Sequence, residues 1–114
     1  MSPCLFCSII NHEINASIVY EDDLVVAFND INPQAPTHVL IVPRRHIASL
    51  SDLTAADNEL VGELVRRAAA IAKDRGLAAD GFRTVFNTNR AAGQTVFHIH
   101  LHLLGGRTMH WPPG

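Results

Sequence analysis

Three histidines alternate with apolar residues near the end of the chain, in the stretch VFHIHLHLL at residues 96–104. Successive side chains of a β-strand point to opposite faces of the sheet, so every second residue shares a face. The stretch therefore predicts a strand over residues 95–104, with His98, His100 and His102 together on one face. The other face would be the core face and carry Phe97, Ile99, Leu101 and Leu103.

Three imidazoles on one face leave three interpretations open. They could be ordinary surface residues, although a surface strand is more easily built from Thr, Lys or Glu. They could bind zinc or copper. They could catalyse a reaction, since imidazole can attack, accept a proton and donate one near neutral pH. The preceding turn, Gly93-Gln94-Thr95, favours catalysis, because its amide and hydroxyl can donate hydrogen bonds to an anion such as phosphate.

A long helix is predicted upstream of the histidines. Between residues 54 and 76, apolar side chains recur at steps of three and four, which is typical of an amphipathic helix. Thr54 and Asp57 resemble a capping box at its start. Gly76 suits the position after the helix, where the backbone is often left-handed.

Strands are predicted where β-branched and aromatic residues gather between turn signals. They cover 17–22, 24–30, 38–43 and 82–87, after a short helical turn at 4–13. Short loops join most of them, which favours antiparallel pairing. The sequence thus predicts a single α+β domain over residues 1–114: a five-stranded, mainly antiparallel sheet with one long helix and a short N-terminal helix.

Composition limits the classes of partner. The net charge is −2 and the charged residues are interspersed, so we expect a small nucleotide at most rather than a nucleic-acid chain. The apolar runs are too short to span a bilayer, and no signal peptide is evident, so no membrane partner is expected. The chain has two cysteines, Cys4 and Cys7, which are too close for a useful structural disulfide. We therefore expect reduced thiols and a cytoplasmic protein.

The histidine pattern, the stretch DINPQAPTH at 30–38 and the ending WPPG at 111–114 together resemble the histidine triad (HIT) superfamily, in particular its Hint branch. The resemblance covers nearly the whole chain and implies a HIT-like fold. It also implies a homodimer that binds purine nucleoside monophosphates. The implied activity is that of a purine nucleoside phosphoramidase, which hydrolyses the P–N bond of adenosine 5′-phosphoramidates, such as AMP joined to an amine or to lysine. No cofactor is implied for catalysis.

Catalytic roles follow from the same resemblance. His100 would attack the phosphorus and form a nucleotidyl-histidine intermediate that water then hydrolyses. The backbone carbonyl of His98 would accept a hydrogen bond from the other ring nitrogen of His100, His102 would contact the phosphate, and His38 would extend the histidine network.

The resemblance also implies a nucleotide pocket. Asp30 would bind the ribose hydroxyls, although an Asx turn is its alternative role. Asn87, Gly93, Gln94 and Thr95 would lie beside the phosphate, although Asn87 could simply form a turn. The base would lie against Ile31, Phe6 and Ile10, of which the last two could instead be ordinary core residues. Trp111, in the C-terminal tail, would reach toward the partner's site and influence substrate choice.

A second metal hypothesis concerns Cys4 and Cys7, which have the C-x-x-C spacing of a zinc knuckle. Bacterial proteins of the resembled superfamily suggest His46 as a third ligand and His98 as a fourth. A structural zinc is thus possible, and two reduced, partly buried thiols are the alternative.

Three further functions stay open at this point. The protein could be a nucleotide-binding regulator whose hydrolysis is incidental, although a pure binder would not need a nucleophile between two histidines. It could be a dinucleoside polyphosphate hydrolase, against which the WPPG ending argues. It could bind metal through the triad, a site that should survive mutation of Cys4 and Cys7.

Overall fold

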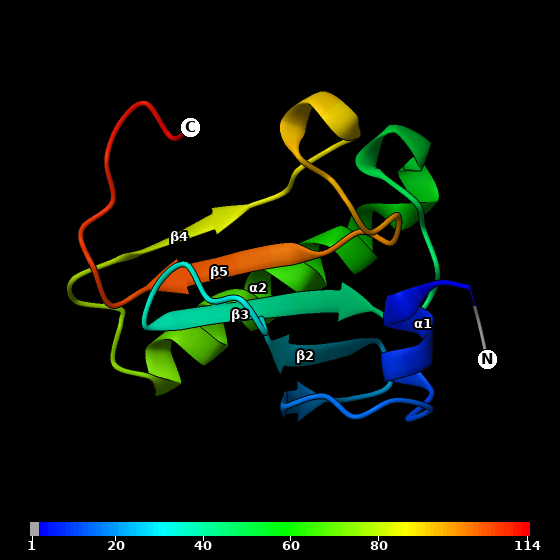
Figure 1. The fold of residues 1–114 in the computed structure, drawn as a ribbon, viewed down its shortest axis with the longest axis horizontal. Coiled ribbons are helices and arrows are strands. Elements are labelled where there is room, and N and C mark those ends of the chain that lie inside the picture. The colour runs from blue at the N-terminus through cyan, green and yellow to red at the C-terminus, as the bar shows by residue number, and fades with distance from the viewer. Residues whose placement is uncertain (1–2) are drawn as a thin grey trace.

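Five strands form one sheet in the computed structural model, which describes residues 3–114 (Figure 1). They are β1 (Ile18–Glu21), β2 (Val25–Asn29), β3 (Thr37–Pro43), β4 (Phe82–Val85) and β5 (Leu101–Gly105). Their order in the sheet is β1-β2-β3-β5-β4, and every neighbouring pair is antiparallel. The predicted fold class, α+β with a five-stranded antiparallel sheet, is confirmed.

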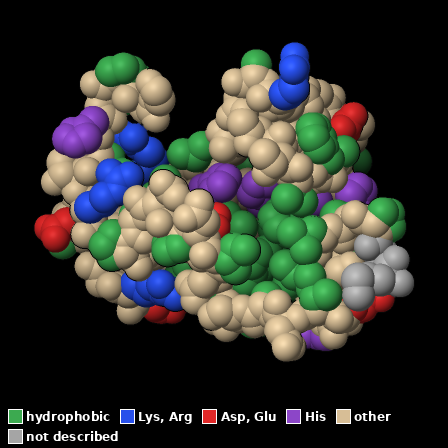
Figure 2. All heavy atoms as spheres, in the orientation of Figure 1, with side chains coloured by type: hydrophobic (Ala, Val, Ile, Leu, Met, Phe, Trp, Pro, Cys, Tyr) green, Lys and Arg blue, Asp and Glu red, His purple; other side chains and the backbone are tan. Residues whose placement is uncertain are grey.

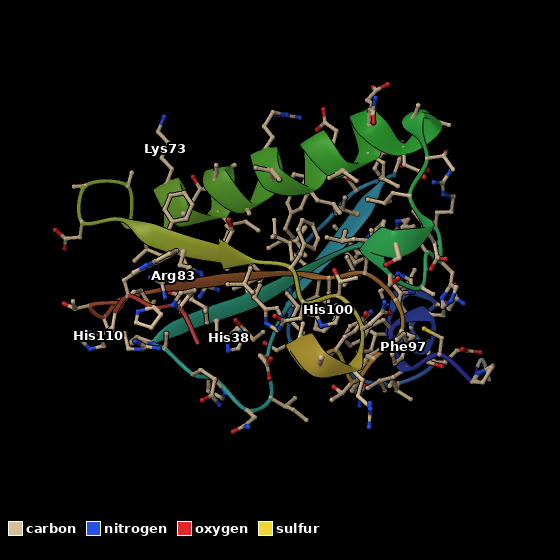
Figure 3. The ribbon with its side chains drawn as sticks, turned by 90° about the horizontal axis from the view of Figure 1, so that it is seen from above. His38, Lys73, Arg83, Phe97, His100 and His110 are labelled. Carbon is tan, nitrogen blue, oxygen red and sulfur yellow. The ribbon has the colours of Figure 1, made fainter. Side chains whose placement is uncertain are left out.

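The two helices cover opposite faces of this sheet. Helix α2 (Asn58–Asp74) lies on one side, and the short α1 (Leu5–Ile10) lies on the other (Figure 3). Strands β2 and β3 are therefore buried on both faces. One set of alternate residues packs with α2, namely Val25, Ala27, Val39 and Ile41, and the other set packs with α1, namely Val26, Phe28, Leu40 and Val42.

The long helix begins later than its apolar pattern predicts. Residues 50–52 and 55–57 form two short 3₁₀ turns. Asp57 accepts a hydrogen bond from the backbone N–H of Thr54 at 2.8 Å, so the predicted capping box lies at the start of the second turn. Gly76 has a φ of +76°, the left-handed conformation expected after the helix. Within residues 3–114, neither helix is both long enough and apolar enough to cross a membrane.

The prediction of a strand over 95–104 is wrong for residues 95–100. Strand β5 begins at Leu101, and the chain bends at residues 96–98. The backbone before β5 bonds to loops rather than to a strand: the N–H of Ile99 donates to the carbonyl of Ile47 at 2.8 Å. As a result Phe97, expected on the core face, is 48% exposed, whereas Ile99 and Leu101 are buried as expected.

Candidate active site

A cavity of about 430 Å³ opens on the face of the sheet that carries α1. Figure 2 shows histidine side chains gathered along a hollow, beside a patch of hydrophobic side chains. The apolar part of the lining comes from α1, β2, β3 and the segment between α1 and β1, and includes Phe6, Ile9, Ile14, Phe28 and Leu40. The polar part includes Asp30, Asn87, Gly93, Thr95, His100 and His102.

His100 is held in one tautomer. Its Nδ1 lies 2.8 Å from the backbone carbonyl oxygen of His98. A carbonyl oxygen can only accept, so Nδ1 carries the proton and donates it. Burial lowers the pKa of His100, which favours the neutral ring. Its Nε2 therefore carries a lone pair, and the ring lines the cavity on the side of the sheet away from α2 (Figure 3).

His38 and His102 form a second directed chain of hydrogen bonds. The backbone N–H of Gln34 donates to Nδ1 of His38 at 3.0 Å, so the proton of the neutral His38 is on Nε2. That nitrogen lies 2.9 Å from Nδ1 of His102, to which it donates, and 3.4 Å from a carboxylate oxygen of Asp30. The neutral His102 then carries its own proton on Nε2. Among the described residues, this buried atom has no hydrogen-bond partner.

An unpartnered buried N–H is costly unless a ligand satisfies it. His102 lines the same cavity as His100, so the two rings offer complementary groups to one molecule. His100 offers a lone pair and His102 offers a donor. An electrophilic atom that bears a negatively charged oxygen, such as phosphorus in a phosphate ester or amide, fits this pair.

The buried state of His102 makes stability depend on pH. Burial, followed by the neighbouring His100 and His38, lowers its pKa from 6.5 to about 4, against an opposing effect of Asp30. The unfolded chain then binds more protons than the native protein between pH 6.5 and 4, so the free energy of unfolding falls as the pH falls through this range. Burial also lowers the pKa of His38, against an opposing effect of Asp30, so its contribution to stability changes with pH in the same sense. We expect the His102 contribution to reach about 2–3 kcal/mol by pH 4.5.

Urea unfolding of the wild type and of His102→Gln, measured at several pH values between 7 and 4.5, checks this expectation. Glutamine does not titrate, so the variant should lose less stability than the wild type on acidification. Parallel pH profiles for the two proteins would contradict it.

The apolar half of the cavity is organised around Phe6, which is buried. Its ring meets those of Phe28 and His100 edge to face, with centroids 5.4 and 5.0 Å apart. Ile9 lines the cavity, whereas the predicted Ile10 is buried in the core and is not part of the lining. Ile31 lies at the cavity with its side chain fully exposed.

The structure brings Asp30, Asn87, Gly93 and Thr95 to the cavity together with the histidines. One carboxylate oxygen of Asp30 accepts the backbone N–H of Asn32 at 2.8 Å, which is the Asx turn weighed as its alternative role. The other oxygen faces His38. The turn and a contact with a ligand are thus compatible, and the roles of these four residues stay predictions.

Gln94 and Trp111 are placed elsewhere. The amide of Gln94 is buried and donates to the carbonyl of Ala48 at 2.7 Å, while its oxygen accepts the backbone N–H of Asn89 at 2.8 Å. Gln94 therefore supports the turn rather than lining the cavity. Trp111 is 82% exposed and lies in a hollow beside β4, outside the cavity of its own chain. Its reach toward a partner's site stays a prediction.

A separate cluster joins Cys4, Cys7, His46 and His98, whose donor atoms lie within 4.8 Å of one another. Nδ1 of His98 is 3.5 Å from each sulfur and 3.1 Å from Nδ1 of His46, which is 3.4 Å from the Cys7 sulfur. Tetrahedral zinc with bonds of about 2.0–2.1 Å to nitrogen and 2.3 Å to sulfur separates its ligands by roughly 3.3–3.8 Å. Nε2 of His98 donates to the carbonyl of Pro43 at 2.8 Å, which leaves Nδ1 unprotonated toward the cluster. Four donors of the right type thus fit a zinc ion.

The three triad histidines do not form one metal cage. His98 faces the cysteines, whereas His100 and His102 face the cavity. Asp30, His38 and His102 also lie close together. A metal on Nε2 of His38 would move its proton to Nδ1, where it would meet the N–H of Gln34. That donor–donor conflict disfavours a metal at this second group.

Several site residues escape sequence reasoning. The Pro43 carbonyl and the Gln34 N–H fix the tautomers of His98 and His38, but backbone groups carry no sequence signal. Leu40 could have been found, because it shares a strand face with His38 two residues away. Ile9 and Ile14 line the cavity from a segment whose path the sequence leaves open.

Comparison with known proteins places the chain in a family. The HIT domain model matches residues 11–109, and the chain belongs to the HIT family. An uncharacterized HIT-like protein of Synechococcus elongatus is 54% identical over 110 residues, 96% of each chain. The purine nucleoside phosphoramidase of Escherichia coli is 51% identical over 92% of this chain and 88% of its own length. The crystal structure of a HIT family hydrolase from Legionella pneumophila superposes with a TM-score of 0.96 at 54% identity, over 97% and 99% of the two chains.

Zinc occurs among the relatives. A 14 kDa zinc-binding protein of Zea mays is 50% identical over 99% of this chain and 89% of its own length. A Zn-bound histidine triad family protein from Mycobacterium smegmatis superposes with a TM-score of 0.79 at 36% identity, over 92% and 76% of the two chains. A Cys/His cluster able to hold a metal is therefore present in a chain whose relatives include zinc-binding proteins.

Proposed function

We propose that this protein is a purine nucleoside phosphoramidase that hydrolyses the P–N bond of adenosine 5′-phosphoramidates. The observation that carries the proposal is the tautomer pair in the cavity. A lone pair on Nε2 of His100 lies beside an N–H of His102 that has no partner within residues 3–114. The 51% identity to the Escherichia coli phosphoramidase supports the choice of reaction.

In the proposed first step, Nε2 of His100 forms a bond to the phosphorus while the P–N bond breaks. The electrons of the P–N bond pass to the departing nitrogen, which leaves as an amine after receiving a proton that the Thr95 hydroxyl relays from water. The N–H of His102 donates to a phosphoryl oxygen. The His98 carbonyl accepts a hydrogen bond from the Nδ1–H of His100, and so stabilises the positive charge on the phosphorylated ring. The hydroxide that remains from this water then attacks the phosphorus, the P–Nε2 bond breaks with its electrons returning to Nε2 of His100, and AMP leaves.

In the same proposal the base packs against Phe6, Ile9 and Phe28. The ribose hydroxyls donate hydrogen bonds to the carboxylate of Asp30, whose oxygens each keep a lone pair beyond the contacts with Asn32 and His38. Asn87, Gly93 and Thr95 surround the phosphate, while Gln94 acts indirectly by holding the turn. Hydrolysis by this route needs no cofactor. The reduced thiols of the cluster fit a cytoplasmic location.

The test is release of AMP by the purified protein from adenosine 5′-phosphoramidate, compared with diadenosine tetraphosphate at the same concentration. We expect turnover of the phosphoramidate to be clearly faster. Preference for the dinucleotide would favour the polyphosphate hydrolase instead. Binding of AMP without turnover of either substrate would favour the nucleotide-binding regulator.

We also propose that Cys4, Cys7, His46 and His98 hold a structural zinc ion. The matching donor distances and the fixed tautomer of His98 support it. Metal analysis of the protein purified without added zinc should find about one equivalent, and the variant Cys4→Ser/Cys7→Ser should lack it.

We further propose that the protein is a homodimer paired through β4. This strand is an edge of the sheet, and Phe82 on it is a large apolar side chain left partly exposed. Sedimentation equilibrium at micromolar concentration should give a mass about twice the 12.5 kDa of one chain. Phe82→Asp should shift the protein toward the monomer, and a wild type that sediments as a monomer would contradict the proposal.

A further inference from the structure

Helix α1 belongs to both the cavity and the Cys/His cluster. Cys4 caps the helix and Cys7 lies within it, and both sulfurs are in the cluster. Phe6 and Ile9, on the same helix, line the cavity. The two sulfurs of the cluster and part of the wall of the proposed base site are therefore held by one short helix and its cap.

A helix as short as α1 does not hold its shape or position alone. It has six residues, and isolated helices of that length are unstable in water. Its side chains anchor it in two ways: apolar packing of Phe6, Ile9 and Ile10 on the sheet, and the two sulfurs beside His46 and His98. A metal ion shared by the four donors would make the second anchor rigid.

His98 joins the same cluster to the proposed nucleophile. Its ring is completely buried, with Nδ1 in the cluster and Nε2–H on the Pro43 carbonyl. The backbone carbonyl of His98 accepts a hydrogen bond from the Nδ1–H of His100. Residues 95–100 are not part of the sheet, so the contact of the His98 ring with Pro43 and the hydrogen bond from the Ile99 N–H to the Ile47 carbonyl hold this backbone in place. A change in the position of that ring would move the group that fixes the His100 tautomer.

We propose that the Cys4–Cys7–His46–His98 cluster, loaded with zinc, positions the nucleotide site, holding the α1 wall against the base and the His98 carbonyl against His100. Its nucleotide part rests on the function proposed above. The zinc content of the protein should then set its affinity for nucleotide. The packing between the sheet and α2 should persist without zinc, because it uses a separate set of core residues.

The experiment compares zinc-loaded wild type, chelator-treated wild type and Cys4→Ser/Cys7→Ser. Calorimetry measures the affinity for AMP, which requires no turnover. Hydrogen exchange measures the α1 amides, and ¹⁵N NMR of histidine rings reports the tautomer of His100. Without zinc we expect AMP to bind at least about tenfold more weakly, the α1 amides to exchange faster, and the His100 ring to lose its single tautomer. Adding Zn²⁺ should restore the chelated wild type but not the double variant.

Ile71→Val is the matched control, because it weakens the core between α2 and the sheet without touching the cluster or the cavity. It should leave AMP affinity and the ring spectrum unchanged. A folded, zinc-free protein with wild-type AMP affinity and an unchanged His100 spectrum would overturn the proposal. If the zinc-loaded wild type fails to bind AMP, the proposed function fails, and the ring spectrum and α1 exchange alone decide whether the cluster positions His100 and the helix.

Discussion

His100→Ala should lower kcat/KM for adenosine 5′-phosphoramidate by about 10⁴-fold or more, because it removes the only group proposed to attack phosphorus. AMP affinity should change little, since the base and ribose contacts come from other residues. Steady-state hydrolysis and calorimetry with AMP measure the two quantities on the same preparations.

A matched control is His12→Asn. His12 is an exposed histidine outside the cavity with a φ of +58°, a conformation that asparagine tolerates. It should retain wild-type activity. If His100→Ala hydrolyses the substrate within about tenfold of the wild type, His100 is not the nucleophile.

Phe6→Ala should give the second large effect, in both stability and nucleotide affinity. Phe6 is 4% exposed and packs with Phe28, His98 and His100. Its truncation should lower the free energy of unfolding by about 3–5 kcal/mol. Because the same ring forms a wall of the cavity, AMP should also bind about tenfold more weakly. Urea unfolding and calorimetry with AMP check the two effects.

Phe97→Ala provides the comparison within the same region. Phe97 is 48% exposed, so its truncation should cost less than about 1 kcal/mol and leave AMP affinity unchanged. Should Phe6→Ala fold too poorly to assay, Phe6→Leu keeps most of the apolar volume but loses the aromatic contacts. Wild-type AMP affinity in both Phe6 variants would exclude this side chain from the nucleotide site.

The fold was largely predictable because the patterns that define it are local. Runs of β-branched and aromatic residues between turn signals predict four of the strands, the three- and four-residue steps predict the helix, and Gly76 marks its end. The prediction of a strand over residues 95–100 is wrong because alternation does not reveal whether a neighbouring strand exists to pair with. Their backbone groups bond to the Ile47 carbonyl and to side chains instead, and this tertiary choice leaves Phe97 exposed.

The site was partly predictable, by motif rather than by geometry. The cluster of Cys4, Cys7, His46 and His98 assembles as the resemblance implied. Gln94 and Ile10 are not at the cavity, because the amide of one and the apolar side chain of the other are buried in supporting structure. Which nitrogen of each histidine carries the proton depends on backbone carbonyls and N–H groups that only the folded chain brings into place.

The central pairing of the sheet has a consequence for how the chain folds. Strands β3 and β5 join residues that are 60 to 68 positions apart, from Ile41 with Leu101 to Thr37 with Gly105. Closing so long a loop is slow compared with forming α2 or the hairpin of β1 and β2. The hydrogen bond between His38 and His102 cannot exist before that closure. A refolding chain should therefore regain its helical signal first and its ability to bind AMP last, and nucleotide binding should report completion of the fold.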